Sequence, residues 1–283
     1  EAGVDLLERH QNEKFFLYFS TYLPHDEIKN EDGSTLDAPE AVVQKYQRKI
    51  AAMQAAGEDL QGHDNPVYAA MIEETDRSVG AIIEKLNALG LREDTLVLFI
   101  SDNGGLSKYT SNRPLRGEKC TLYEGGIRVP MIASMPGKIK AGAVSHEPVS
   151  GMDFYPTFCT FMGVEPTDPA RVDGADLTEL LFSGKSLGLR NLFWNFPCYQ
   201  KPEVPERRPR SALRRGDWKI IHRYEDDGYE LYNLKEDIGE SNNLAASHPQ
   251  ILQKMRQELN ASYERFGAVE HLSPNPDFDP GSR

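Results

Sequence analysis

Two groups of residues between Thr95 and Pro130 have types and spacings suited to binding a metal ion and an anion. Asp102 and Asn103 follow an apolar run at residues 95–101 and precede two glycines. This pattern predicts a buried parallel strand that ends at a turn, and ligands of open α/β sheets bind beyond such strand ends. Two oxygen donors there favour Ca²⁺ or Mg²⁺ over zinc. A plain turn is the alternative, because Asp, Asn and Gly commonly form turns.

Lys119 lies in a second, glycine-containing stretch of the same region. It belongs to Arg116-Gly117-Glu118-Lys119, and Glu124-Gly125-Gly126-Ile127-Arg128-Val129-Pro130 follows soon after. Glycine lets the backbone approach a ligand closely or adopt a positive φ. A lysine in such a loop can act as a point charge toward a sulfate or phosphate oxygen. These residues alone leave a purely structural loop open.

Taken together, the Asp102-Asn103-Gly104 turn and the later segment PLRGEKCTLYEGGIRVP (residues 114–130) resemble the sulfatase family. This family is the formylglycine-dependent branch of the alkaline-phosphatase-like superfamily. The chain departs from the family pattern at Glu118 and Cys120, where glycine is usual, and this leaves the local loop geometry open.

Three further segments extend the resemblance over nearly the whole chain. An apolar run at residues 15–20 is followed by Pro24-His25, and residues 151–157 read GMDFYPT. Residues 212–221 and 230–234 are similar to carboxyl-terminal strands of the same family.

The resemblance implies roles for four residues. Asp102 and Asn103 would be two ligands of the active-site cation, usually Ca²⁺ and less often Mg²⁺. Lys119 would contact the sulfate group, and His25 would bind a sulfate oxygen or the leaving-group side. Cleavage of a sulfate ester needs fixed positive charge around the sulfur and a proton donor for the departing alcohol. Without the resemblance, a Pro-His pair at a strand exit reads as an ordinary surface loop.

The nucleophile that the resemblance implies is missing from the 283 residues. Sulfatases of this type make formylglycine from Cys or Ser in a Cys/Ser-x-Pro-x-Arg motif. None of Cys120, Cys159 and Cys198 is followed by x-Pro, and the Ser134-Met135-Pro136 segment lacks the arginine. In the family, this motif and the remaining cation ligands lie upstream of the segment resembling residues 15–20. We therefore expect the chain to be the carboxyl-terminal part of a longer sulfatase and to be inactive alone.

The expected function is part of a sulfuric-ester hydrolase that acts on O-sulfate esters of glycans or aryl compounds. Two alternatives remain: a phosphodiesterase or phosphonate monoester hydrolase of the same superfamily, and a non-catalytic, truncated binding protein.

Composition excludes some partners. The net charge of −12 argues against nucleic acid, and no apolar run approaches the roughly 20 residues of a membrane span. Three cysteines do not form a disulfide framework and are expected to be small buried hydrophobes. The resemblance implies a periplasmic or extracellular location, and the oligomeric state is left open.

The predicted fold is α/β, with part of an alkaline-phosphatase-like, doubly wound mixed sheet in residues 1–186 and a small antiparallel α+β subdomain in residues 187–283. Helices are expected near residues 38–56, from Asn65-Pro66 to Gly90, and from a capping Asp153 to Met162. In the subdomain, strands are expected at residues 191–196, 212–221 and 229–234. A capping box at residues 247–250 would open a helix through Phe266, and an extended tail would follow.

Five arginines gather near the first two strands of the subdomain, beside Lys201. A basic loop on an acidic chain could steer a polyanionic glycan, although a solvated loop is the alternative. The arginines are Arg207, Arg208, Arg210, Arg214 and Arg215.

Overall fold

A computed structural model describes residues 2–25, 36–200 and 204–268. The chain divides into two compact units. The first consists of Glu1–Ser101, Gly105–Ser111 and Pro130–Val144, and the second of Asp102–Gly104, Asn112–Val129 and Ser145–Arg283. The expected boundary at residue 186 stays a prediction. Among the described residues, no helix combines the length and the apolar character needed to cross a membrane.

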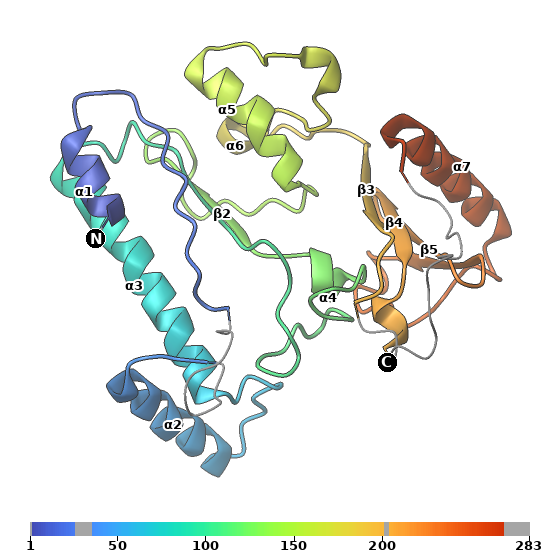
Figure 1. Cartoon of the computed structure of the whole chain (residues 1–283), viewed down its shortest axis with the longest axis horizontal. Coiled ribbons are helices and arrows are strands. Elements are labelled where there is room, and N and C mark those ends of the chain that lie inside the picture. The colour runs from blue at the N-terminus through green and yellow to red at the C-terminus, as the bar shows by residue number, and fades with distance from the viewer. Residues whose placement is uncertain (1, 26–35, 201–203, 269–283) are drawn as a thin grey trace, which may run out of the picture. The chain divides into compact units, whose positions relative to one another are not determined.

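The described residues of the first unit form the helices α1 (Ala2–Arg9), α2 (Glu40–Ala55) and α3 (Pro66–Ala88) (Figure 1). The predicted cap of α3 is confirmed, because the side-chain oxygen of Asn65 accepts hydrogen bonds from the amides of Val67 and Tyr68 at 3.1 and 3.0 Å. Gly90 follows the helix with a φ of 69°, a left-handed conformation that suits glycine. Local capping signals therefore set both ends of the longest helix.

The strands of the first unit differ from the prediction. β1 (Val97–Ile100) pairs antiparallel with β2 (Met131–Ser134), instead of lying in a parallel sheet. Phe99 and Ile100 are 38% and 37% exposed, so this end of the strand is not buried. Within the described ranges β2 is the one strand neighbour of β1, and no second strand covers its other edge. The run at residues 15–20 belongs to no helix or strand of the described structure.

Four short helices of the second unit lie between residues 151 and 183. They are η1 (Gly151–Asp153), α5 (Phe154–Met162), η2 (Pro169–Arg171) and α6 (Thr178–Ser183). Asp153 takes the N-cap position of α5, as predicted, but its carboxylate makes no capping hydrogen bond to that helix. Its carboxylate instead forms a capping box with Ser150 one turn earlier, and Arg190 Nη1 donates to it at 2.6 Å. The helix ends at Met162, as predicted, and Gly163 follows it with a φ of 70°.

A four-stranded antiparallel sheet forms the centre of the second unit. Its strands are β3 (Asn191–Phe196), β4 (Arg210–Arg215), β5 (Trp218–Arg223) and β6 (Gly228–Asn233), in that spatial order. The strand predicted at residues 212–221 is in fact two strands. Gly216, with a φ of 58°, and Asp217 form the turn between them. The short helix η3 (Pro205–Arg207) precedes β4.

Helix α7 (Pro249–Phe266) lies along one face of this sheet (Figure 1). Leu259 is fully buried against Leu213 and Ile220 in the core between them. The helix was predicted, but its capping box is not formed. The hydroxyl of Ser247 donates to the Leu244 carbonyl at 3.3 Å, and the side chain of His248 makes no capping bond.

The prediction that the three cysteines are small buried residues is confirmed only in part. All three are free, as expected for a chain without a disulfide framework. Cys159 is buried, whereas Cys120 is half-buried and Cys198 is exposed.

Glycines pack the segments at residues 102–104 and 116–126 directly against each other, backbone to backbone. We call these two segments the motif assembly. The amide of Gly104 donates to the Gly126 carbonyl at 3.0 Å, and the amide of Gly125 donates to the Arg116 carbonyl at 2.7 Å. A Cβ atom at Gly104 would overlap the carbonyl oxygen of Gly125, and one at Gly126 would overlap that of Thr121. Close backbone approach therefore requires glycine at these positions.

A buried lysine connects the motif assembly to the sheet. Lys219 on β5 is fully buried, and its Nζ lies 2.9 Å from Glu124 Oε1 and 2.8 Å from Glu240 Oε1. Glu124 opens the short helix α4 (Glu124–Ile127), and its amide donates to Glu240 Oε2 at 2.6 Å. Burial raises the pKa of Glu240 above its ordinary value, and the charge of Lys219 opposes this rise. Buried charges of this kind are tolerated because they pair with one another.

Replacing Lys219 tests this connection. Lys219→Met removes the lysine charge from two buried carboxylates, although Glu124 keeps Arg214 and Arg128 at 3.4 and 3.6 Å. The loss should lower the free energy of unfolding by about 3–5 kcal/mol. The folded-state pKa of Glu240 is already raised, and loss of Lys219 should raise it further. A raised folded-state pKa gives stability at low pH that is lost as pH rises. The loss should therefore be larger at pH 8 than at pH 5 when urea unfolding is measured at both.

Lys185→Met is the matched control, because this side chain is 70% exposed and pairs with Glu179 at 3.6 Å. An exposed pair contributes about 1 kcal/mol at most. A Lys219→Met protein as stable as this control would contradict the connection.

The glycine contacts give a second prediction. Gly104→Ala should lower the free energy of unfolding by at least ~3 kcal/mol, because the new methyl group meets backbone rather than a movable side chain. Gly151→Ala is its control, since a Cβ atom there meets nothing within 4 Å, and its effect should stay within about 1 kcal/mol. Equal shifts in the denaturation midpoints of the two variants would refute the close packing.

Candidate functional site

Asp102 and Asn103 lie at the bend that follows β1. Asp102 is exposed and Asn103 is half-buried, and Asn103 Nδ2 lies 2.6 Å from Asp102 Oδ1. The two side chains are therefore adjacent. If the side-chain amide of Asn103 rotated, its oxygen would replace its nitrogen beside Asp102 Oδ1, since an amide presents oxygen on one side and nitrogen on the other.

These two residues fit a hard cation by donor chemistry, but they supply only part of a coordination shell. Ca²⁺ takes about six to eight oxygen ligands. In the described parts of the chain, no three His, Cys, Asp or Glu side chains gather as a metal site would require. The assignment of Asp102 and Asn103 as cation ligands stays a prediction.

Lys119 lies at the tip of a tight turn inside the motif assembly. The amide of Thr121 donates to the Glu118 carbonyl at 3.0 Å, which closes the turn around Lys119 and Cys120. The Thr121 hydroxyl also donates to that carbonyl at 2.7 Å and accepts from the Glu118 amide at 3.1 Å. Lys119 is half-buried. Hydrogen bonds from both the backbone and the side chain of Thr121 therefore hold the turn that carries Lys119.

Cys120 and Glu118, which stand where the family usually has glycine, each have a defined role in the lysine turn. Cys120 occupies the third turn position with a φ of 70°, a conformation that favours glycine. The chain thus keeps the turn despite the substitution. The carboxylate of Glu118 lies 2.6 Å from Arg207 Nη2, so the second departure attaches the turn to η3.

His25 lies in the first unit, whereas Asp102, Asn103 and Lys119 lie in the second. His25 is exposed, its amide donates to the Tyr22 carbonyl at 2.9 Å, and its ring centre lies 5.2 Å from that of Tyr22. The backbone contacts of the motif assembly bring the other three residues into one packed region. The meeting of His25 with them stays a prediction.

The five arginines do not form an unpaired basic surface, as steering of a polyanion would favour. Arg208 pairs with Glu225 at 3.0 Å, and Arg214 lies 3.4 Å from Glu124. Arg215 Nη1 donates to Asn191 Oδ1 at 2.8 Å, and Arg207 pairs within the second unit as described above. Lys201 lies outside the described residues. Arg210 differs from the others, because its described partners are backbone carbonyls.

Sequence reasoning missed a polar network around Tyr123, which follows the Lys119 turn. The guanidinium of Arg116 stacks over the Tyr123 ring at 3.9 Å. The Tyr123 hydroxyl donates to Glu230 Oε2 at 2.8 Å. Burial, and then the charge of Glu230, raises the pKa of Tyr123 to about 12, so the hydroxyl stays a donor at neutral pH. The segment at residues 114–130 contains Arg116 and Tyr123, but Glu230, which accepts the hydrogen bond from Tyr123, lies 107 residues later.

Comparison with known proteins gives two family matches. Residues 1–164 match the sulfatase family model, and residues 117–265 match the model of the carboxyl-terminal region of N-sulphoglucosamine sulphohydrolase. A sulfatase of Formosa agariphila is 36% identical over 222 residues, covering 70% of this chain and 40% of the relative. Human arylsulfatase A is 32% identical over 211 residues, covering 73% and 40% respectively. The chain thus spans less than half the length of these two relatives.

Solved structures agree with the sequence matches. The crystal structure of Ps i-CgsB in complex with k-i-k-neocarrahexaose superimposes with a TM-score of 0.71 at 26% identity, covering 92% of this chain and 53% of that one. The structural neighbours confirm the predicted alkaline-phosphatase-like α/β fold. With a family model matched over more than half of its residues, the chain belongs to the sulfatase family.

Proposed function

We propose that the protein carrying this chain hydrolyses O-sulfate esters, with Lys119 and His25 at the sulfate group and Asp102 and Asn103 at a hard cation, usually Ca²⁺. One observation carries the proposal. Backbone packing of Gly104 on residues 125–126 holds the acidic turn and the lysine turn in one assembly. Family membership supports the same reaction class.

The chemistry assigns a separate task to each residue. The three outer oxygens of a sulfate ester carry the negative charge, and Lys119 would hold one of them through its ammonium group. A divalent cation at Asp102 and Asn103 would add positive charge beside the same group. His25 would bind a sulfate oxygen or protonate the departing alcohol. The nucleophile in this proposal is a formylglycine outside the 283 residues.

The substrate class rests on the names of similar proteins. One relative is an arylsulfatase, and one structural neighbour is bound to k-i-k-neocarrahexaose. We accordingly propose aryl or glycan sulfate esters as substrates. A periplasmic or extracellular location is part of the same proposal.

Two substitutions test the assignment in the protein that carries this chain. Lys119→Ala and His25→Ala should each lower kcat/KM for an aryl sulfate by at least ~10²-fold, because each removes charge stabilisation or proton transfer. Lys185→Ala changes an exposed lysine and is the matched control. Rates are compared by release of the aryl alcohol, after confirming equal folding by circular dichroism.

Wild-type turnover in both variants would remove these residues from the site. The same assay with an aryl phosphate diester or an aryl phosphonate monoester separates the alternative reaction, since a phosphodiesterase or a phosphonate monoester hydrolase would prefer the phosphorus compound. Loss of activity with Lys185→Ala as well would point to a general effect of removing lysine.

A further inference from the structure

The second unit contains a pocket of about 390 Å³ beside the motif assembly. It lies where β4 begins and β5 ends, and Arg210 and Arg223 face each other there in the strand register. Four arginines and four acidic side chains line it, together with Tyr123 and two prolines. Pockets of this size accommodate small ligands. Because the positive and negative side chains are equal in number, the net charge of the pocket does not decide what can bind. What decides it is which of these side chains are already paired with one another.

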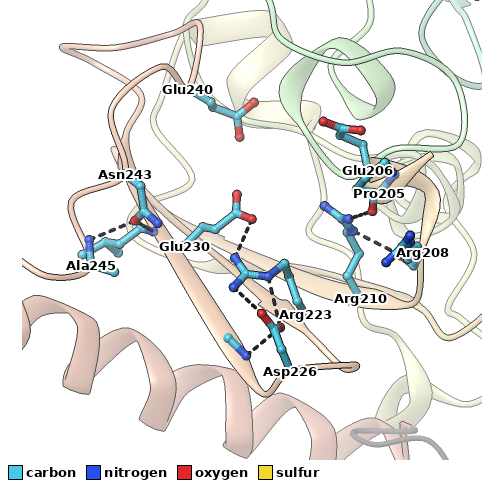
Figure 2. Close-up of polar contacts among 12 residues, drawn as sticks. Pro205, Glu206, Arg208, Arg210, Arg223, Asp226, Glu230, Glu240, Asn243 and Ala245 are labelled. Carbon is cyan, nitrogen blue, oxygen red and sulfur yellow. Dashed lines mark hydrogen bonds and ion pairs between the residues drawn. The ribbon is translucent and has the colours of Figure 1, made fainter. Parts of the chain in front are cut away.

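Arg223 occupies two of the acidic groups (Figure 2). Its Nη1 donates to Glu230 Oε1 at 2.9 Å, and its Nη2 donates to Asp226 Oδ2 at 2.8 Å. Glu230 also accepts from the hydroxyls of Tyr123 and Tyr232 at 2.8 and 2.7 Å. Burial alone would raise the pKa of Glu230, but these hydrogen bonds more than offset it and lower the pKa. Glu230 therefore stays ionised and fully engaged.

A third acidic group is engaged at the pocket wall. Glu225 accepts from Arg208 Nη1 at 3.0 Å and from the Tyr199 hydroxyl at 2.9 Å. Glu206 is the exception among the four. It lies 4.0 Å from Arg116 Nη2, and both side chains are about 40% exposed, as befits a loose surface pair.

Arg210 is the arginine whose charge has no acidic partner in the described residues. It is 3% exposed, its Nε donates to the Arg208 carbonyl at 3.2 Å, and its Nη2 donates to the Pro205 carbonyl. Its Nη1 is buried and finds no acceptor among the described residues. Figure 2 shows one terminal nitrogen of Arg210 directed away from these two carbonyls. A buried donor on a charged group calls for an acceptor, and the strongest acceptors are oxyanions.

Arg116 adds a second positive charge at the same place. Arg116 and Arg210 both lie over the ring of Tyr123, at 3.9 and 5.7 Å from its centre. Arg116 Nη1 is used by the Tyr232 hydroxyl and the Glu240 carbonyl, at 3.2 and 3.0 Å. Within the described part of the chain, its other terminal nitrogen has the loose contact with Glu206 alone. A ligand that displaces Glu206 would meet two guanidinium groups.

We propose that this pocket binds an oxyanion group of a saccharide, a sulfate or a carboxylate, through Arg210 Nη1 and Arg116. The residues that line the pocket do not include those of the Lys119 turn at residues 118–121, and binding there needs no hydrolysis. The volume exceeds that of a single oxyanion, so the attached sugar can enter with it. The pocket would hold an anionic glycan by a unit that is not being cleaved.

Calorimetric titration tests the proposal in the Lys119→Ala protein, where the proposed catalytic contact with sulfate is absent. Glucose 6-sulfate, glucuronate and glucose serve as sulfate, carboxylate and uncharged probes. One or both anionic probes should bind saturably, and Arg210→Gln should weaken that binding by at least ~10-fold, as expected for loss of a charge-assisted hydrogen bond. The preferred probe identifies the oxyanion.

If Arg210→Gln does not fold, a second variant that is expected to strengthen oxyanion binding still tests the proposal. Glu206→Gln removes the negative charge of the loosely held acid at the pocket and should tighten oxyanion binding by about 3-fold or more, because this carboxylate repels an anionic ligand and competes with it for Arg116. Arg171→Gln, with an 87% exposed side chain, is the control and should change nothing.

Three results would each overturn the proposal: no saturable binding of either anionic probe, equal binding of glucose, or unchanged or weaker affinity in Glu206→Gln. Unchanged affinity in a folded Arg210→Gln protein would overturn it as well. Because binding is measured without turnover, failure here is distinct from failure of the hydrolytic assignment.

Discussion

Close contact between glycine backbones is the constraint on which the second unit depends. Gly104 reaches the carbonyls of residues 125 and 126 only because none of these positions carries a side chain. This contact joins a turn that offers two oxygen donors to a turn that presents a lysine. The geometry is set by backbone hydrogen bonds and sterics, so it varies little with the rotamers of the functional side chains. A rigid backbone frame is what a site for a small charged group requires.

Two polar networks then attach this frame to the carboxyl-terminal sheet. One is the buried cluster of Lys219 with Glu124 and Glu240. The other is the set of hydrogen bonds that Glu230 accepts from tyrosines and arginine. Each network includes a residue of the segment 116–126, so the sheet and the lysine turn are held together by direct polar contacts. The pocket beside Arg210 lies against the second network, which explains why Glu230 is already engaged there.

Local signals allowed much of the helical structure to be predicted, because a cap acts within one turn. Asn65 and Gly163 mark helix ends as their types suggest. The hairpin at residues 216–217 was missed, because regular strand-forming residues continue on both sides of a two-residue turn. The partners Glu124 and Lys219 are 95 residues apart, so no local pattern could reveal their contact. The candidate site was recognised through its motif, but its supporting ion pairs and the role of Cys120 as a glycine substitute required the three-dimensional structure.

The central claim is that the motif assembly and the sheet unfold as one unit, and native-state hydrogen exchange measures this most directly. The informative amides are those of Gly125 and Glu124, which donate to the Arg116 carbonyl and to Glu240 Oε2. They should exchange with the same opening free energy as the buried strand amides of Leu213 and Ile220, because one cooperative opening exposes them all. Exchange at Gly125 and Glu124 that is ~100-fold faster than at the strands, through a separate local opening, would contradict the account.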